Sequence, residues 1–404
     1  MNNNKKNYIL LIIVALLRYL GDSFFYGFLT RYIKGLNLTD IRLGILTAVI
    51  PFMAIIGNFF IYKLGTNYKR RKYLYLTYSI IEPSLIMFFG FYDNFYYVLM
   101  LDIVCNFCSN AFYNIMDTYI VKITSDNNKP YSLGRVFGTV GYIIGIIVGG
   151  LLISAINYKY TFLIGGGLML SSTIFFLFIR FPQKDVELMN QNNKASETTR
   201  ALFKNKKFII YMIGAALILG SIWSGDNFFA QLTVKATSLE YSISFDSAIV
   251  LEAIVMVVCA RFATINNYKK MTMIASLTLV IRYIVFSIPN LDYHVYLYLE
   301  ILRGFSFGMF TSANIILIGQ LTGKRLQYQG YFLMVVIDEL IASVFNLAGP
   351  SIISIAGNSF TPIFAILAST SLIGFVLILI TKFNNDRKNI TMNTEEVNNG
   401  YSTN

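Results

Sequence analysis

Charged residues, cysteine and histidine are all scarce in this sequence. Only 13% of its 404 residues are charged and 55% are hydrophobic, a balance too apolar for an ordinary globular surface. The single histidine, His294, is expected in a loop at a helix start, which favours a solvated residue over a proton relay. The CxxC spacing of Cys105 and Cys108 lies inside an apolar run, where it fits small packing residues better than metal or redox chemistry. No nucleophile, metal or phosphate constellation is left, so we expect neither an enzyme nor a bound cofactor.

Long apolar runs are abundant instead, and each is close to the roughly 20 residues with which a helix crosses a bilayer. They lie near 8–30, 42–64, 73–91, 95–121, 134–156, 160–179, 208–232, 244–263, 271–289, 293–318, 329–356 and 361–381. The runs lack the alternation of barrel strands, and hydrocarbon permits only helices or closed barrels. We therefore predict an all-α membrane protein with twelve transmembrane helices.

A polar internal segment divides these runs six and six. The predicted units are a first six-helix half at 1–182, a cytoplasmic linker at 183–206, a second half at 207–382 and a disordered tail at 383–404. The motifs “TNYKRR” at 66–71 and “NNYKKM” at 266–271 occupy the same expected loop of each half. Two pseudo-symmetric halves around a central cavity are the architecture of many secondary transporters.

The net charge of +12 follows the predicted topology. Most lysines and arginines fall in segments on the same side as the N-terminus, and such segments are cytoplasmic by the positive-inside rule. We therefore place the chain in the cell membrane as a multi-pass protein with both termini in the cytoplasm. This distribution favours the lipid bilayer as partner over nucleic acid.

Ionisable residues inside the runs are the informative exceptions, because each is costly in hydrocarbon unless it is paired, protonated or hydrated. The basic ones are Arg18, Arg135, Arg282 and Arg303, and the acidic ones considered are Asp22, Glu82, Asp102, Asp117, Asp226, Glu252, Glu300, Asp338 and Glu339. Because acids outnumber bases, some carboxylates must be protonated, hydrated or balanced by a cation. The surplus favours coupling to H⁺ or Na⁺.

Several of these charges also have a purely structural explanation. Arg18 and Asp22 are one helical turn apart, as Glu300 and Arg303 nearly are, so each pair can face the same way and neutralise itself. Asp226, like Asp102, is expected near an outer helix end, where hydration suffices, and we assign it no role.

Arg135 stands at the start of a glycine-rich apolar run, at a depth similar to Asp117 on the preceding helix, so the two can pair across helices. Glycines at 134, 138, 141, 145 and 149 form a stripe that lets a neighbouring helix or a solute approach the backbone.

The segment “MDTYIVKITSDNNKPYSLGRVFGTVGY” at 116–142 resembles the fourth-to-fifth helix region of the oligosaccharide:H⁺ symporter (lactose permease-like) group of the major facilitator superfamily. The resemblance implies that Asp117 and Arg135 bind solute hydroxyls and that Tyr142 stacks on the solute ring. A carboxylate accepts hydrogen bonds and a guanidinium donates them in bidentate fashion, which suits vicinal hydroxyls.

The second half resembles the same group more loosely. “VLEAIVMVVCARFATINNYKK” at 250–270 implies that Glu252 takes part in solute binding and its coupling to H⁺. Arg282 in “LVIRYIVFS”, and Glu300 and Arg303 in “EILRGFSFGMF” at 300–310, fall where the group carries its proton site. Ser306 stands in place of the carboxylate expected there, so Glu300, Glu252 or Asp338 would have to titrate instead.

We therefore predict a monomeric secondary transporter that moves a small polar solute, a sugar or a nucleoside, by alternating access coupled to H⁺. The predicted solute-binding residues are Asp117, Arg135, Tyr142 and Glu252, and the predicted ion-coupling residues are Arg282, Glu300, Arg303 and Asp338. Two alternatives remain open. Surplus acids and many aromatics would also suit an exporter of cationic or amphipathic compounds, and a membrane receptor could keep the same fold without transporting.

Overall fold

The computed structural model describes residues 3–64, 68–127, 131–179, 202–262, 267–323 and 326–383. Regular structure within these ranges is entirely helical, which confirms the predicted all-α class. Most of the predicted linker, residues 183–201, and the predicted tail from residue 384 lie outside the described residues.

The first half contains a long helix broken close to the predicted boundary between its fifth and sixth crossings. Its helices are α1 (Asn3–Tyr26), α2 (Leu29–Gly35), α3 (Asp40–Leu64), α4 (Tyr68–Ile86), α5 (Phe95–Asp126) and α6 (Tyr131–Leu177). In α6, Asn157 has non-helical dihedrals, φ 78° and ψ 173°, so this helix turns back and supplies two crossings.

The second half repeats this plan. Its elements are α9 (Lys206–Leu232), η1 (Thr233–Lys235), α10 (Ser238–Phe262), α11 (Tyr268–Phe286), α12 (Tyr293–Leu299), α13 (Ile301–Thr322), α14 (Gln327–Ile355) and α15 (Thr361–Ile380). The short α12 continues directly into α13, and the two form one crossing.

Eight helical stretches in the described residues are long and apolar enough to span a membrane. One of them, Val136–Leu177, contains the break at Asn157 and is long enough for two crossings. The remaining predicted crossings are α4, α5 and α11, whose sequences include charged residues. The described helices are therefore consistent with the twelve predicted crossings.

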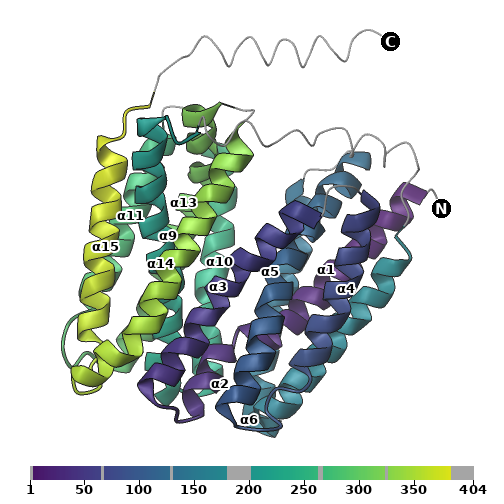
Figure 1. Ribbon diagram of the computed structural model, residues 1–404, viewed down its shortest axis with the longest axis horizontal. Helices are drawn as coiled ribbons and strands as arrows, with labels where there is room; N and C mark the ends of the chain where they lie inside the picture. The colour runs from purple at the N-terminus through teal and green to yellow at the C-terminus, as the bar shows by residue number, and fades with distance from the viewer. Residues whose placement is uncertain are drawn as a thin grey trace.

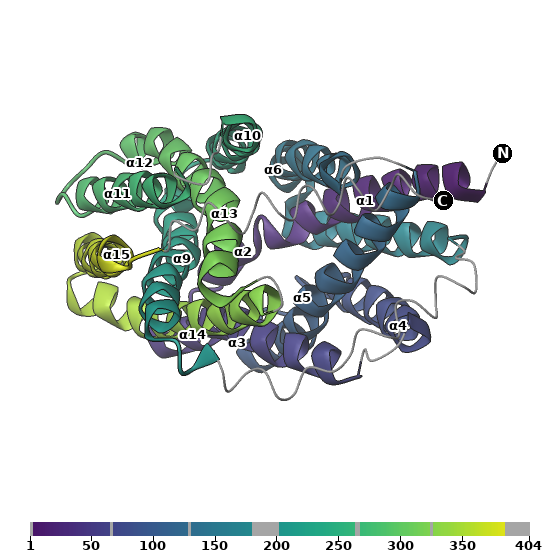
Figure 2. The same ribbon diagram turned by 90° about the horizontal axis from the view of Figure 1, so that it is seen from above.

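The two halves form separate bundles that touch at one end (Figure 1). The start of α1 and the end of α15 lie at the end where the bundles lean apart. We call the opposite end, where they meet, the closed end. Seen from above, the halves adjoin along two seams, one between α3 and α14 and the other between α6 and α10 (Figure 2).

Polar and aromatic contacts hold the seams together. Thr47 on α3 and Asn346 on α14 exchange two side-chain-to-carbonyl hydrogen bonds, each 3.2 Å long. The rings of Phe28 and Tyr241, from opposite halves, lie 5.8 Å apart. One continuous apolar core joins the second half to the closed-end part of the first, whereas a separate cluster containing Leu11 and Tyr75 fills the other end of the first half.

Candidate functional site

A cavity of about 330 Å³ lies between the two halves near the closed end. Its wall in the first half is made by Tyr26, Gly27, Leu29, Thr30, Ile50 and Pro51. Its wall in the second half is made by Trp223, Asp226, Asn227, Ala230, Tyr241, Phe245, Glu339 and Asn346. The size is near the lower end of the roughly 300–1,000 Å³ of small-molecule sites. A solute held here would contact both halves.

The cavity wall carries polar atoms that have no partner among the described residues. These atoms are Oδ1 of Asp226, Nδ2 of Asn227 and Oδ1 of Asn346. The side chains of Asn227 and Asn346 are well buried, with residue exposures of only 8% and 4%. An unmade hydrogen bond at a buried polar group costs about 1–3 kcal/mol. One donor and two acceptors on residues of the cavity wall are therefore buried without a partner, and a small rotation of these side chains would turn them toward a bound solute.

Arg303 on α13 organises the acidic side of this cavity. Its guanidinium lies 2.9 Å from Oδ2 of Asp226 on α9 and 2.6 Å from Oε2 of Glu252 on α10. It also stacks over the ring of Phe307, 4.8 Å from the centroid. Because two carboxylates share one guanidinium, this cluster keeps one negative charge in excess when both are ionised.

Aromatic faces complete the cavity. Trp223, the single tryptophan of the chain, packs edge-on against Phe307 at 5.3 Å between centroids. Tyr241 stacks with Phe245 at 5.7 Å and with Phe229 at 5.9 Å, so Tyr241 is packed inside this aromatic group, while the half-buried Phe245 and Trp223 present aromatic surface to the cavity. Such surfaces suit the face of a planar or ring-shaped solute.

A second carboxylate, Glu339 on α14, also lines the cavity. No lysine, arginine or histidine in the described part of the chain lies at ion-pair distance from it. Its neighbour Asp338 is 2% exposed and does not line the cavity, and its Oδ1 has no hydrogen-bond partner within the described ranges. Asp338, the predicted coupling residue, is thus next to the cavity but does not face it, whereas its neighbour Glu339 does.

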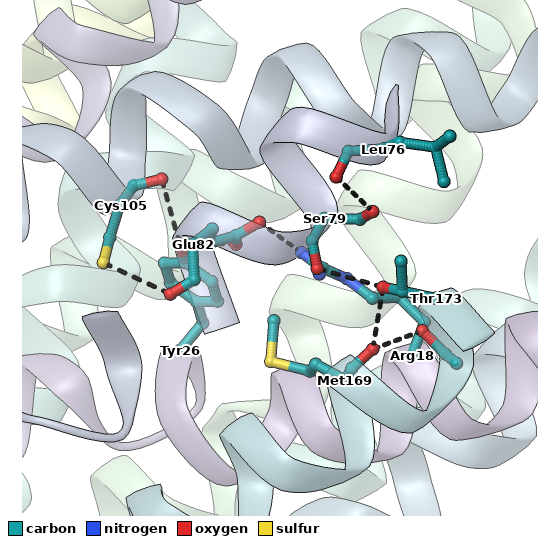
Figure 3. Close-up of polar contacts among 9 residues, drawn as sticks. Arg18, Tyr26, Leu76, Ser79, Glu82, Cys105, Met169 and Thr173 are labelled. Carbon is teal, nitrogen blue, oxygen red and sulfur yellow. Dashed lines mark hydrogen bonds and ion pairs between the residues drawn. The ribbon is translucent and has the colours of Figure 1, made fainter. Parts of the chain in front are cut away.

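A fully buried ion pair lies behind the first-half wall (Figure 3). Nη2 of Arg18 on α1 lies 2.5 Å from Oε2 of Glu82 on α4, and neither side chain is exposed. The hydroxyl of Tyr26, which lines the cavity, donates to Oε1 of Glu82 at 3.0 Å. Arg18 also lies over the ring of Phe112 at 4.0 Å. Tyr26 therefore connects the cavity with this buried pair.

The second half has a corresponding buried pair. Nη2 of Arg282 on α11 lies 2.5 Å from Oε2 of Glu300, at the junction of α12 and α13, and neither side chain is exposed. Neither residue lines the cavity.

Arg18 does not bind Asp22 directly, and Arg303 does not bind Glu300 directly, so the pairing of neighbours on one helix is wrong. The guanidinium of Arg18 binds Glu82 instead, and that of Arg303 binds Asp226 and Glu252. A long arginine side chain reaches a carboxylate on a facing helix as readily as one on its own helix.

The remaining predicted solute residues lie on α5 and α6. Asp117 and Arg135 belong to these helices, but their side chains lie outside the described part of the structure. Tyr142 on α6 packs against the apolar core and lies within electrostatic range of Asp22 in its own half and Arg303 in the other. The roles predicted for these residues remain predictions.

Several residues of the cavity are not recognisable from the sequence. From the sequence, Asp226 has no assigned role, because it lies near a helix end. The cavity extends toward that end, however, and Asp226 both lines the cavity and binds Arg303. Asn227 and Asn346 carry no charge, so only their position in the folded chain distinguishes them from other amides. The pattern that could have identified Asp226 and Asn227 is the run “WSGDN”, which is polar inside an otherwise apolar crossing.

Arg31 on α2 spans the halves beside the cavity. It is only 4% exposed, and its guanidinium donates to the backbone carbonyls of Ala236 at 2.6 Å and of Val234 and Thr237 at 3.4 Å. Its Cζ lies 4.7 Å from the ring centroid of Tyr241. The fold thus makes Arg31 a bridge between the halves.

Comparison with known proteins agrees with this architecture. Residues 11–345 match the family model described as Major Facilitator Superfamily. A crystal structure of a mutant of the nucleoside transporter NupG is 17% identical, with a TM-score of 0.78, and the match covers 93% of this chain and 100% of that one. A second NupG crystal structure is 16% identical, with a TM-score of 0.76 and coverage of 95% and 100%. No curated protein sequence matches the chain significantly.

Proposed function

The chain belongs to the Major Facilitator Superfamily, and we propose that it is a secondary transporter of a small polar solute, specifically a nucleoside, driven by H⁺. A sugar is the other solute that the sequence predicted. The structural likeness to NupG transporters makes the nucleoside the better choice of the two.

The cavity between the halves is the observation that carries this proposal. Its wall combines a donor, Asn227 Nδ2, with two acceptors, Asp226 Oδ1 and Asn346 Oδ1, none of which has a partner in the described residues. Nucleobase edges and ribose hydroxyls present the complementary acceptors and donors. Trp223 and Phe245, both half-buried in the cavity wall, offer aromatic surface on which a base stacks, as aromatic side chains do with bases elsewhere.

Alternating access supplies the mechanism. The halves touch at the closed end and lean apart at the other end, where α1 begins and α15 ends. With cytoplasmic termini, this conformation is closed to the outside. Rocking of the halves would open the closed end and expose the cavity to the other side of the membrane.

We assign H⁺ coupling to the cluster of Arg303 with Asp226 and Glu252. When both carboxylates are ionised, they share the guanidinium. Protonation of Glu252 would leave Arg303 to Asp226 alone and change the charge beside the cavity. A proton and a solute would then each alter the affinity for the other, as linkage requires.

Uptake into proteoliposomes tests the proposal. We expect purified protein to accumulate labelled nucleosides when an inward H⁺ gradient is imposed, and a protonophore to abolish the accumulation. Liposomes without protein are the control. Absence of gradient-driven uptake across nucleosides, hexoses and disaccharides would contradict transport, and binding without flux would instead indicate a receptor.

Asp226→Asn tests the site itself. We expect it to weaken solute binding about tenfold or more, because a charge-assisted hydrogen bond is worth about 1.5–3 kcal/mol and the pairing with Arg303 is lost as well. Quenching of Trp223 fluorescence by added nucleoside measures the affinity, since this residue lines the cavity and is the only tryptophan. The matched control is Asp102→Asn, a buried carboxyl of α5 away from the cavity. Equal affinities in the two variants would remove Asp226 from the site.

Glu339 favours one second candidate, export of cationic compounds. It is a carboxylate in an aromatic cavity with no basic partner in the described ranges, and cations bind well to such surroundings. Fluorescence quenching of Trp223 by organic cations measures this binding. Export would be supported over nucleoside transport if the quenching were lost in Glu339→Gln and unaffected by nucleosides.

A further inference from the structure

Asp246 on α10 is a buried carboxyl at the seam between the two halves. It lies one helical turn after Ser242, which packs so closely against Gly150 on α6 that a side chain at Gly150 would collide with it. Asp246 is 4% exposed and does not line the cavity, although its neighbour Phe245 does. Separation of α6 from α10 would therefore expose it to solvent.

Neither carboxylate oxygen of Asp246 has a hydrogen-bond partner among the described residues. From α6, the titratable group within electrostatic range is the hydroxyl of Tyr142. From α13, the charged residue near this part of α10 is Arg303, whose guanidinium is already bound to Asp226 and Glu252.

The third element packed against α10 is α12, which presents the backbone carbonyl of Leu297 to Ser244. Tyr142 also lies within electrostatic range of Asp22 on α1. Within the described residues, no cation therefore compensates Asp246.

We propose that Asp246 is a proton-binding site whose occupancy is linked to closure of the α6–α10 seam. An ionised carboxylate removed from water without a donor or a cation is strongly disfavoured, whereas the neutral acid is tolerated. With the seam closed, Asp246 holds a proton. With the seam open, water solvates the carboxylate and the proton is released.

The sign of the linkage follows from this difference. The closed seam binds the proton more tightly than the open one, so lowering the pH favours closure. For a protein oriented with the closed end outside, acid outside the cell would drive the halves toward the state that faces the cytoplasm. This step rests on the proposed function, whereas the proton site itself does not require transport.

Distances across the closed end test the proposal without any solute. Spin labels replace the exposed Tyr160 on α6 and Tyr298 on α12, in a background where the three buried cysteines, Cys105, Cys108 and Cys259, are alanine. Double electron–electron resonance then measures the populations of short and long distances. We expect the short-distance population to grow as the pH falls from about 8 to about 5, with a limiting slope of about tenfold per pH unit for a single proton.

Asp246→Asn, which mimics the neutral acid, is expected to keep the short distance at every pH. Asp102→Asn, a buried carboxyl within the first half, should leave the pH dependence unchanged. Asp246→Leu, apolar and similar in size, provides the same test if the asparagine variant does not fold. A pH-independent native protein, or a full pH response in either Asp246 variant, would overturn the proposal. Because no solute is present, neither outcome depends on whether nucleosides are transported.

Discussion

At the scale of single residues, three buried arginines form ion pairs between helices. Arg18, Arg282 and Arg303 each bind a carboxylate from a facing helix, and the first two pairs are completely inaccessible to solvent. Glu82 on α4 and Arg282 on α11 occupy the same offset in the two halves with opposite charges. A buried pair is costly to create but much more costly to break, because the remaining charge stays in a medium of low dielectric. These pairs therefore fix which helices pack together.

We predict that Arg282→Met lowers the stability by about 3–5 kcal/mol, because it leaves the Glu300 carboxylate buried and unpaired. The double variant Arg282→Met with Glu300→Leu should regain most of this loss. Thermal unfolding in detergent, followed with a thiol-reactive dye, measures both, since the cysteines are buried in the folded protein. A double variant as unstable as the single one would show that the pair is not the cause.

At the scale of helices, the glycine stripe of α6 is a packing surface for α1. Gly141 lies against the carbonyl of Leu16, and Gly145 lies against Ser23 and the carbonyl of Leu20. The sequence left open whether a helix or a solute approaches this stripe. The structure shows that it is a helix, which lets the two helices approach more closely than larger side chains would allow.

We predict that Gly141→Ala lowers the unfolding temperature, because the added methyl group meets a backbone carbonyl that cannot rotate away. Overpacking of this kind costs about 1–3 kcal/mol. Gly167→Ala is the matched control on the same helix, since nothing lies within 4 Å of its added Cβ. It should be neutral or stabilising by up to about 1 kcal/mol, because alanine favours helix more than glycine does. Equal shifts for both variants would contradict close packing at Gly141.

At the scale of the whole molecule, the two halves are joined mainly by contacts at the closed end. Arg31 donates to three carbonyls of the segment between α9 and α10, and Thr47 and Asn346 bond across the α3–α14 seam. These bonds are few and lie beside the cavity. A transporter that must open here needs contacts that hold this state without making it permanent.

We predict that Arg31→Ala shifts the population toward separation of the halves at the closed end. Its hydrogen bonds come from a charged donor, worth about 1.5–3 kcal/mol, which corresponds to a shift of roughly tenfold or more. The distance between labels at positions 160 and 298 measures the shift. Arg42→Ala is the control, because Arg42 is exposed and stacks on Phe95 of its own half. Unchanged distances in Arg31→Ala would show that the seams alone keep the closed end shut.

The sequence alone determined the membrane class, the order of the helices and the boundary between fifth and sixth crossings, which the structure places at Asn157. These features follow from the length and polarity of continuous segments, which are local properties of the chain. The sequence also indicated most of the charges inside the apolar runs, although Asp246 was not among them, and it did not indicate their partners. Only tertiary packing brought Arg303 to Asp226 and Glu252, placed uncharged Asn346 beside the cavity and carried Arg31 across to the other half. Each of these contacts joins residues on different helices, and the distance between facing helices is set by how they pack.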